Sequence, residues 1–335
     1  MNILIIGGTI FLGRHIIDSA IKRNHNIVLF NRGKHNPELF PELEKIKGDR
    51  EGDLSELKRR KFDAVIDTCG YVPKVVRKSA DYLRDSAGHY TFISSISVYK
   101  NAGDLDLDET SETESVKDGI TDTMTLENYG ALKALCEREV SEVFGNDSSL
   151  VRSGLIVGDG DFSDRFTYWV ERISRGGKVI VPVSETNNVQ FIDVKDLADW
   201  VIKMTEEKIS GVYNSTGPLE TLSLYDLINQ CIEFTGSRAD FIGIAEEFLL
   251  KENVVPYKDL TLWLPADSAG MNNVNISKAK SAGMKIRPLT ETLIDTMKYH
   301  LSRGKDFKLR TGLSSEREKE IFDKWESVSK SKLVW

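Results

Sequence analysis

The sequence predicts an α/β fold, in which a doubly wound parallel sheet is joined to a smaller, discontinuous C-terminal α/β domain. Through roughly the first 150 residues, short apolar runs alternate with amphipathic stretches, the pattern of strands buried on both faces by covering helices. After residue 152 this rhythm changes, and Gly, Asp and Asn become frequent. The chain has 335 residues, enough for two domains, and its 40% hydrophobic content is ordinary for a globular protein.

The apolar runs predict strands of the main sheet at residues 3–6, 27–30, 64–67, 90–94 and 149–152, with a shorter strand near 46–47. Amphipathic stretches predict helices at 11–23, 74–84 and 126–144 between them. The same pattern returns as a strand at 189–192 and a helix at 194–206. The first domain is therefore predicted to comprise residues 1–153 and 189–210.

Residues 154–188 and 211–303 are predicted to form the second domain, because their short strands and helices interrupt the first pattern. Ser223 is predicted to cap a helix at 224–235, and Ser277 a helix at 278–282. Residues 304–335 are predicted to be a helical tail, which Ser315 and Glu318 open as a capping box. One side of that helix carries apolar residues, which indicates packing rather than chemistry: Ile321, Phe322 and Trp325.

The composition argues against several classes of protein. A net charge of −7 and a pI near 5.5 argue against a nucleic-acid partner, which favours a basic surface. The apolar runs are of strand length, so no membrane span is predicted, and the N-terminal run lacks the basic flank of a signal peptide. Three scattered cysteines indicate reduced thiols in a cytoplasmic protein, and five histidines show no metal-ligand spacing, so no metal is expected.

An acidic segment at 104–122 holds eight acidic residues and one lysine. Such a run of charge is typical of a solvated loop. A lid over an active site is the alternative.

A glycine turn follows the first predicted strand and opens the first helix, with the sequence Gly7-Gly8-Thr9-Ile10-Phe11-Leu12-Gly13. Backbone N–H groups and the positive end of the helix dipole make such a turn an anion site, suited to the pyrophosphate of a dinucleotide. Ile10 stands where the usual fingerprint has its central glycine, but the position in the first βα unit supports the assignment. The first domain is therefore predicted to be a Rossmann-type dinucleotide-binding domain.

The end of the second strand is predicted to face the adenosine of the cofactor. Asn31 and Arg32 stand where an acidic residue would bind the ribose 2′-hydroxyl and repel a 2′-phosphate. A guanidinium suits a phosphate and stacks on adenine, so NADP(H) is favoured over NAD(H). Asp49 and Arg50 follow the third strand, where Asp49 accepts from the adenine amino group or belongs to an ordinary turn.

The pentapeptide Tyr129-Gly130-Ala131-Leu132-Lys133 places a phenol and an ammonium one helical turn apart on one face. A nearby ammonium stabilises phenolate, so Tyr129 is predicted to exchange a proton with an alcohol or a carbonyl. Ser95 lies at the end of the fifth strand, and open α/β sheets bind ligands at the carboxyl ends of their strands. Ser95, Tyr129 and Lys133 are therefore predicted to form one catalytic site.

Five segments carry a further resemblance: the glycine turn at 7–13, Ile-Ser-Ser-Ile-Ser-Val-Tyr at 93–99, the pentapeptide at 129–133, Val-Arg-Ser-Gly-Leu-Ile-Val-Gly at 151–158 and Gln-Phe-Ile-Asp-Val-Lys-Asp-Leu-Ala at 190–198. In this order they resemble the extended short-chain dehydrogenases/reductases of the NAD(P)-dependent epimerase/dehydratase family. The resemblance implies that Tyr129 is the general acid/base, that Lys133 holds the nicotinamide ribose and lowers the Tyr129 pKa, and that Ser95 hydrogen-bonds the reacting oxygen. It also implies cofactor contacts at Cys69, Gly70 and Tyr71.

Two departures from the family pattern bear on the substrate. Family dehydratases carry an Asp-Glu pair where this chain has Ile96 and Ser97, so dehydration of a sugar is not expected. Nucleotide-sugar epimerases place an arginine for the diphosphate where Val189 stands, and Arg165 or Arg172 is then the candidate to replace it. The segment 161–169 offers aromatic and polar groups for a substrate pocket, or forms a helix packed between the domains. Substrate contacts are predicted at Ser97, Arg165, Tyr168 and Gln190.

These features together predict an NAD(P)-dependent oxidoreductase that transfers hydride to or from a carbonyl or hydroxyl carbon of a small polar molecule, such as a sugar derivative. A nucleotide-sugar epimerase is the alternative, because epimerisation oxidises and re-reduces one carbon with the same residues. A non-catalytic RNA-binding protein on the same fold, like the chloroplast stem-loop RNA-binding relatives of the family, is the alternative from another class. The resemblance also implies a homodimer.

Overall fold

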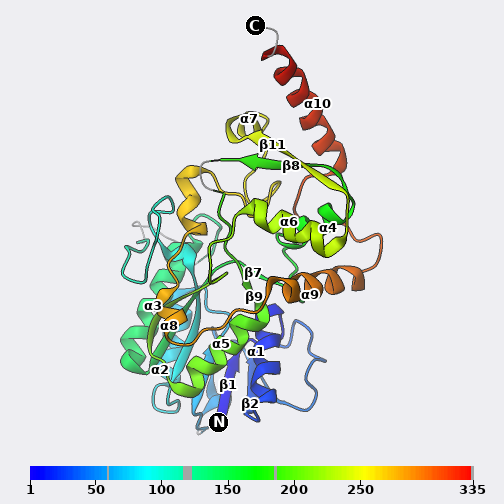
Figure 1. Ribbon diagram of the computed structural model, residues 1–335. Coiled ribbons are helices and arrows are strands. Elements are labelled where there is room, and N and C mark those ends of the chain that lie inside the picture. Colours follow the sequence, from blue (N-terminus) through cyan, green and yellow to red (C-terminus); the bar gives the residue numbers. More distant parts are fainter. Residues whose placement is uncertain (59, 116–122, 185–186, 333–335) are drawn as a thin grey trace.

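A seven-stranded parallel sheet forms the centre of the N-terminal part of the molecule (Figure 1). The computed structural model describes residues 1–58, 60–115, 123–184 and 187–332. The strand order β10-β6-β5-β4-β1-β2-β3 is the order of a Rossmann sheet with one strand added at its edge. The strands are β1 (Asn2–Ile6), β2 (Asn26–Asn31), β3 (Glu44–Lys47), β4 (Ala64–Asp67), β5 (Tyr90–Ser95), β6 (Ser148–Ser153) and β10 (Gly211–Ser215).

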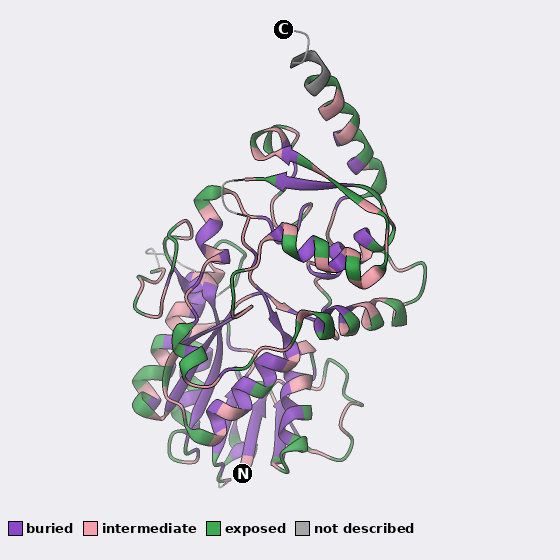
Figure 2. Ribbon diagram, in the orientation of Figure 1, coloured by how far each residue is buried: buried purple, intermediate pink, exposed green. Residues whose placement is uncertain are grey.

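Helices cover both faces of this sheet. α1 (Phe11–Lys22) and α5 (Val194–Glu207) pack together over one face, and α2 (Pro73–Leu83) and α3 (Tyr129–Phe144) over the other. In β1, Ile3 and Ile5 join the apolar cluster under α1 and α5, whereas Leu4 and Ile6 join the cluster under α2 and α3. Successive side chains of a strand point to opposite faces, so the sheet is buried on both sides (Figure 2). The predicted doubly wound sheet is confirmed.

A second apolar core lies beyond the carboxyl ends of these strands, in the C-terminal half of the chain (Figures 1 and 2). Two parallel strand pairs belong to this half, β7 (Ile156–Val157) with β9 (Ile192–Asp193) and β8 (Gly177–Val183) with β11 (Ala239–Ala245). The separate core supports a second domain, whose bounds and substrate-binding role stay predictions. Its helices are α4 (Thr167–Ser174), α6 (Leu224–Thr235), α7 (Glu246–Lys251) and α9 (Leu289–Ser302), whereas α8 (Ser277–Ser281) packs on β10 and buries Ala279 in the core of the first domain. Single 3₁₀ turns complete the chain at η1 (Ser55–Leu57), η2 (Ile96–Val98), η3 (Gly145–Asp147) and η4 (Ala266–Asn272).

The two predicted caps in this half have different outcomes. At α6 the prediction is confirmed, because Ser223 accepts from the Asp226 N–H and the Asp226 side chain completes a capping box. At α8 it is wrong, because Ser277 is the first residue of the helix. The side chain of Asn275 accepts the Ser277 N–H there, at 2.8 Å.

The last helix, α10 (Ser315–Lys332), extends away from the body of the molecule (Figure 1). Its predicted apolar side is confirmed, since Ile321 is fully buried and Phe322 and Trp325 pack against the second core. The predicted capping box is wrong, because the helix already begins at Ser315. Glu318 is turned inward instead and forms a buried ion pair with Arg172, whose Nε lies 2.8 Å from the carboxylate.

Two other predicted elements are shorter than expected. α3 begins at Tyr129 instead of 126, because Thr125 and Asn128 accept from each other's backbone N–H in the turn before it. The strand predicted at 189–192 is reduced to β9, which pairs with β7 and not with the seven-stranded sheet. Neither change moves the predicted catalytic residues off their elements.

The described part of the acidic segment, residues 104–115, packs on the first domain. Leu107 is buried in an apolar cluster with Val98 and Tyr99, and Glu109 accepts from the Asn214 N–H at 2.8 Å. Residues 116–122 lie outside the described residues, so the solvated loop and the lid both stay predictions. Within the described ranges, none of the helices has the length and apolar character that crossing a bilayer requires.

Candidate active site

The turn between β1 and α1 builds one end of the site. Gly13 lies so close to Gly8 that a Cβ on residue 13 would fall 2.6 Å from the Gly8 Cα. Only glycine allows this approach, which brings the first turn of α1 to the carboxyl end of β1. The residue before α1 is Ile10, which offers no side-chain cap, so backbone N–H groups at this helix N-terminus remain for an anion.

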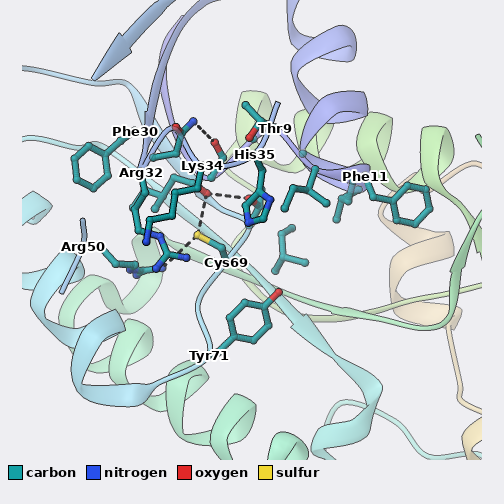
Figure 3. A pocket seen from close by; sticks show the side chains of 18 of the residues that line it. Thr9, Phe11, Phe30, Arg32, Lys34, His35, Arg50, Cys69 and Tyr71 are labelled. Atoms are coloured by element: carbon teal, nitrogen blue, oxygen red, sulfur yellow. Dashed lines mark hydrogen bonds between the residues drawn. The ribbon is translucent and has the colours of Figure 1, made fainter. Parts of the chain in front are cut away.

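A cavity of about 550 Å³ opens on this turn and runs past the carboxyl ends of the neighbouring strands (Figure 3). That volume is typical of cofactor sites. Most residues predicted to bind the cofactor line it: Gly7, Gly8, Thr9, Ile10, Phe11, Leu12, Gly13, Asn31, Arg32, Asp49, Arg50, Cys69, Tyr71, Tyr129 and Lys133. The other predicted site residues are outside its lining: Gly70, Ser95, Ser97, Arg165, Tyr168 and Gln190.

The end of the cavity beside β2 is basic. Arg32, Lys34 and His35 line it from an exposed loop, and Figure 3 shows them gathered on one side. Asn31 has a structural task there, because its side chain donates to the carbonyl of Gly7 at 3.0 Å. Asn31 and Arg32 were predicted at this end of the cavity, but Lys34 and His35 were not, although both follow within three residues of Arg32.

Arg50 lines the cavity, but its guanidinium is already engaged. It donates two hydrogen bonds of 2.8 Å to Asp67, which is fully buried at the end of β4, and Asp67 also accepts from the Tyr90 hydroxyl at 2.8 Å. Burial acts to raise the pKa of Asp67, but the charge and hydrogen bonds of Arg50 outweigh it and hold that pKa below its ordinary value. Arg50 therefore stabilises the wall of the cavity through Asp67, and its charge is not available to bind a phosphate.

Ser95 and Tyr129 meet across the 3₁₀ turn η2. Ser95 Oγ donates to Ser97 Oγ at 3.0 Å and accepts from the Ser97 N–H at 3.1 Å, and its hydroxyl acts to lower the pKa of the Tyr129 phenol. A Cβ on Gly130 would lie 2.0 Å from the Ser97 carbonyl oxygen. Glycine at this place in the pentapeptide is therefore what allows α3 to approach the end of β5, a task that the sequence analysis did not assign.

Lys133 lies one turn further along α3 and is almost fully buried. Its Nζ donates to the carbonyls of Gly70 at 2.8 Å and Ile93 at 2.5 Å, and it lies 4.2 Å from the centre of the Phe92 ring. An ammonium carries three protons, so one remains for a ligand in the cavity. Burial lowers the pKa of Lys133 to about 8.

The effect of Lys133 on the Tyr129 pKa differs from the expectation. Burial raises the pKa of Tyr129 above its ordinary value, and the hydroxyl of Ser95 and the positive charge of Arg165 oppose this. A lysine with a pKa of about 8 has lost its proton before such a phenol ionises, so it has no charge left to stabilise the phenolate. In the protein alone, the tuning expected of Lys133 falls to Arg165.

A buried polar network behind the catalytic residues was also missed. Ser94 Oγ donates to Glu137 at 2.5 Å, and Arg152 donates to the same carboxylate through Nε at 3.0 Å and Nη2 at 2.8 Å. Arg152 also donates to the Tyr99 hydroxyl at 3.1 Å. Glu137 follows Lys133 by one helical turn, and this spacing was the available signal. The network ties α3 to β5, β6 and η2.

The four residues predicted to contact the substrate do not lie together in the structure. The ring of Tyr168 is buried in the second core, and the Gln190 side chain bonds to the Val274 backbone in both directions, at 2.9 and 3.0 Å. These contacts give Tyr168 and Gln190 supporting positions outside the cavity wall. Ser97 is held by Ser95, and Arg165 is the member of the set whose charge reaches Tyr129.

Sequence comparison gives one match. The family model described as the NAD dependent epimerase/dehydratase family matches residues 3–215, more than half of the chain. No curated protein sequence matches the chain significantly.

Solved structures share the fold over about nine tenths of the chain. The UDP-N-acetylglucosamine 4-epimerase from Methanobrevibacter ruminantium M1 has a TM-score of 0.67 and 19% identity, and the match covers 90% of this chain and 99% of that chain. The UDP-glucuronic acid 4-epimerase from Bacillus cereus, in complex with NAD, has a TM-score of 0.64 and 17% identity, with 91% and 100% covered. A dTDP-4-dehydrorhamnose reductase from Clostridium acetobutylicum has a TM-score of 0.61 and 17% identity, with 90% and 100% covered.

Proposed function

The chain belongs to the NAD dependent epimerase/dehydratase family, and from this premise we propose that it transfers hydride between a nicotinamide dinucleotide and a carbonyl or hydroxyl carbon of a small polar molecule. The match to the family model confirms two predictions made from the sequence, the family and the class of enzyme. One observation carries the proposal: a single cavity runs from the glycine turn of α1 to Tyr129 and Lys133.

The residues of the cavity fit a nicotinamide dinucleotide. The close approach at Gly13 and the uncapped N-terminus of α1 suit a pyrophosphate, and Lys133 keeps one N–H for a ribose hydroxyl. When bound, the nicotinamide ring accepts or supplies the hydride.

In this proposal Tyr129 moves the proton of the reacting oxygen. Its phenolate takes the proton of a substrate hydroxyl in oxidation, and its phenol gives a proton to a carbonyl oxygen in reduction. Ser95, whose hydroxyl acts to lower the pKa of that phenol, holds the same oxygen. Behind these residues, Glu137 of α3 accepts from Ser94 of β5 and from Arg152 of β6. These bonds fix α3 against the sheet, so Tyr129, Lys133 and Ser95 stay aligned.

Net oxidation or reduction is the reaction we favour, with epimerisation as the alternative. Both use Tyr129 and Ser95 in the same way, and the epimerases among the solved structures of this fold support the second. Dehydration needs an additional acid and base beside the substrate. Ile96 and Ser97 supply neither a carboxylate nor another strong base at the end of β5, which argues against it.

The proposal is tested by Tyr129→Phe. Loss of the phenol proton should lower turnover by roughly 100-fold or more, the scale of lost acid/base help, while the affinity for NADPH stays within about twofold. Turnover is followed by NADPH absorbance on a panel of carbonyl and hydroxyl compounds, and binding by NADPH fluorescence. Tyr82→Phe, an exposed tyrosine on α2, is the matched control and should change neither quantity. Full activity in Tyr129→Phe would refute the mechanism.

We also propose a preference for NADP(H). The support is the basic rim of Arg32, Lys34 and His35, with no acidic residue at the end of β2. Arg32→Ala should weaken NADPH binding about 10-fold or more and leave NADH binding almost unchanged, since a hydrogen bond to a charged group contributes about 1.5–3 kcal/mol. Arg14→Ala removes an equal charge from an exposed position on α1 outside the cavity lining and is the control.

Tighter binding of NADH than of NADPH by the unmodified protein would contradict this preference. Retention of RNA through a high-salt wash, with no binding of either nucleotide, would instead favour the RNA-binding alternative. We retain a cytoplasmic location as part of the proposal, supported by the free thiols of Cys69, Cys136 and Cys231.

A further inference from the structure

Two arginines lie over aromatic rings near the cavity, and the ring beneath Arg310, that of Phe162, packs edge-on against Phe11 at the start of α1. The Arg165 guanidinium is 5.2 Å from the centre of the Tyr257 ring. The Arg310 guanidinium is 5.8 Å from the centre of the Phe162 ring, and Phe162 lines the cavity. Arg165 is close enough to Tyr129 for its charge to favour the phenolate. Both cations lie outside the lining of the cavity, which Arg310 approaches through the ring of Phe162.

Within the described parts of the chain, neither guanidinium has a carboxylate at ion-pair distance. Their neighbours differ, since Arg172 pairs with Glu318 at 2.8 Å and Arg303 with Asp164 at 2.6 Å. A half-buried guanidinium gives up part of its hydration, and that loss is normally offset by an acidic partner. Arg165 is half-buried and its one recorded side-chain hydrogen bond is to the Ser163 hydroxyl, at 3.3 Å.

The charge of Arg165 acts to lower the pKa of the Asp161 carboxyl group, but the two side chains do not form an ion pair. Burial raises the pKa of Asp161, and its Oδ1 accepts from the Ser163 N–H. Its Oδ2 has no hydrogen-bond partner. Asp161 and Arg165 therefore act on each other's charge without forming a direct ion pair.

The ring beneath Arg165 is held in an uncommon backbone conformation. Tyr257 has a φ of 61°, in the left-handed region that costs an L residue of this size roughly 1–2 kcal/mol. Such strain persists only where the surrounding structure imposes it, and it clusters at ligand sites. The surrounding structure thus holds the Tyr257 ring in place beneath Arg165.

We propose that Arg165, together with Arg310, binds a carboxylate or phosphate carried by the substrate itself, close to the reacting carbon. The inference rests on the proposed hydride transfer and names its substrate class, a small anionic hydroxyl or carbonyl compound. A guanidinium fork suits both anions, and its distance from Tyr129 sets how far the anion lies from the reacting oxygen.

The other arginine considered for an anion, Arg172, is unavailable for this role. It is buried, it donates to the Gly176 carbonyl at 3.0 Å, and it is paired with Glu318. Val189, at the place of the family's diphosphate arginine, is 1% exposed in the second core. The chain therefore keeps its free cations beside the reacting centre and not at the usual remote position.

The test uses the full chain saturated with NADPH and titrates it calorimetrically with sugars that differ in charge. The probes are glucuronate and glucose 6-phosphate, each compared with glucose, and UDP-glucose, whose charge lies on the diphosphate. Glucuronate or glucose 6-phosphate should bind at least about 10-fold more tightly than glucose, the scale of one charge-assisted pair. The stronger of the two identifies the anion as carboxylate or phosphate.

Arg165→Gln should abolish that discrimination, and Arg165→Lys should restore part of it, because a lysine keeps the charge without the fork. Lys308→Gln removes an equal charge from an exposed position near Arg310 and should leave the discrimination intact. NADPH fluorescence on each variant shows that it is folded and loaded.

The inference is wrong if glucose binds as tightly as both anions, if neither anion binds, or if Arg165→Gln keeps the discrimination. It is also wrong if UDP-glucose binds more tightly than both and Arg165→Gln does not weaken it. Failure of the unmodified chain to bind NADPH is a separate result, which refutes the proposed hydride transfer. Normal NADPH binding without anion discrimination refutes only the inference.

Discussion

In the first domain the buried charges of Arg50 and Arg152 are paired with carboxylates, whereas the described part of residues 161–303 combines buried ion pairs with buried polar atoms that lack a hydrogen-bond partner. Arg50 meets Asp67, and Arg152 meets Glu137, each through more than one hydrogen bond. Among the described residues, the buried side-chain atoms that lack a hydrogen-bond partner all belong to residues 161–303, with Asp161 Oδ2, Thr167 Oγ1 and Thr261 Oγ1 as examples.

The two regions therefore differ in how completely their buried polar groups are paired within the chain. A dinucleotide presents the same groups in every enzyme that uses it, so the first domain can satisfy its own buried groups and leave backbone N–H groups, Lys133 and the exposed Arg32, Lys34 and His35 for the ligand. Within residues 161–303, Asp161 and Arg165 lie without close partners of opposite charge. Unsatisfied buried groups are uncommon, and a ligand or water is the usual explanation.

The largest effect is expected from breaking the buried ion pair between Arg50 and Asp67. Arg50→Met leaves Asp67 buried without its counter-ion and should lower the free energy of unfolding by about 3–5 kcal/mol, the usual cost of breaking a buried pair. Urea unfolding followed by circular dichroism measures it. Arg77→Met removes an exposed arginine that also has several carboxylate partners, and its cost should be much smaller because solvent screens them. Equal losses in the two variants would remove the contrast.

A smaller effect is expected at the glycine turn. Gly13→Val forces the backbone of Gly8 away and should cost about 1–3 kcal/mol of stability, as overpacking usually does, and weaken NADPH binding by about 10- to 100-fold. Gly52→Val is the control, since a Cβ there meets nothing closer than 3.5 Å. NADPH fluorescence and urea unfolding give both quantities. Unchanged binding in Gly13→Val would mean that the turn does not hold the pyrophosphate.

Two substitutions, each of which removes one buried hydroxyl, compare a hydroxyl that has a partner with one that has none. Tyr90→Phe removes a donor to Asp67 and should destabilise by about 1.5–3 kcal/mol, because the hydrogen bond is to a charged group. Thr261→Val removes a hydroxyl that has no partner and should be neutral or stabilise by about 1 kcal/mol. Both side chains are fully buried, so urea unfolding compares like with like. A large loss in Thr261→Val would show that its hydroxyl is satisfied after all.

The smallest expected effect is a shift in the ionisation of Tyr129. Arg165 favours the phenolate, so Arg165→Gln should move the Tyr129 titration to higher pH, whereas Lys133→Met should move it less because the lysine is neutral by then. Ser95 and Cys136 are the other groups that act on this phenol, and both remain in the two variants. Phenolate absorbance, taken as the difference from the corresponding Tyr129→Phe variant, follows the titration. A larger shift in Lys133→Met would return the tuning role to the lysine.

The sequence predicted the sheet and the glycine turn after β1 because their signals are local. The run at 7–13 combines strand, turn and helix start within seven residues, and the pentapeptide at 129–133 lies within one helical turn. Arg50 follows β3, Asp67 ends β4 and Tyr90 begins β5, and only the folded sheet brings these three segments together. In the second half the sequence predicted Arg165 and the segment 161–169, but not Tyr257, which lies far from Arg165 along the chain.

The pattern of apolar runs, the glycine turn and the spacing of Tyr129 and Lys133 by themselves determined the α/β class, the family and the elements that carry the site. The tertiary structure decided which charges are free. Burial and pairing take Arg50 and Arg172 out of ligand binding, and burial lowers the Lys133 pKa below the range in which a phenol ionises. Charge compensation and desolvation depend on neighbours distant in sequence, so residue identity alone does not determine them.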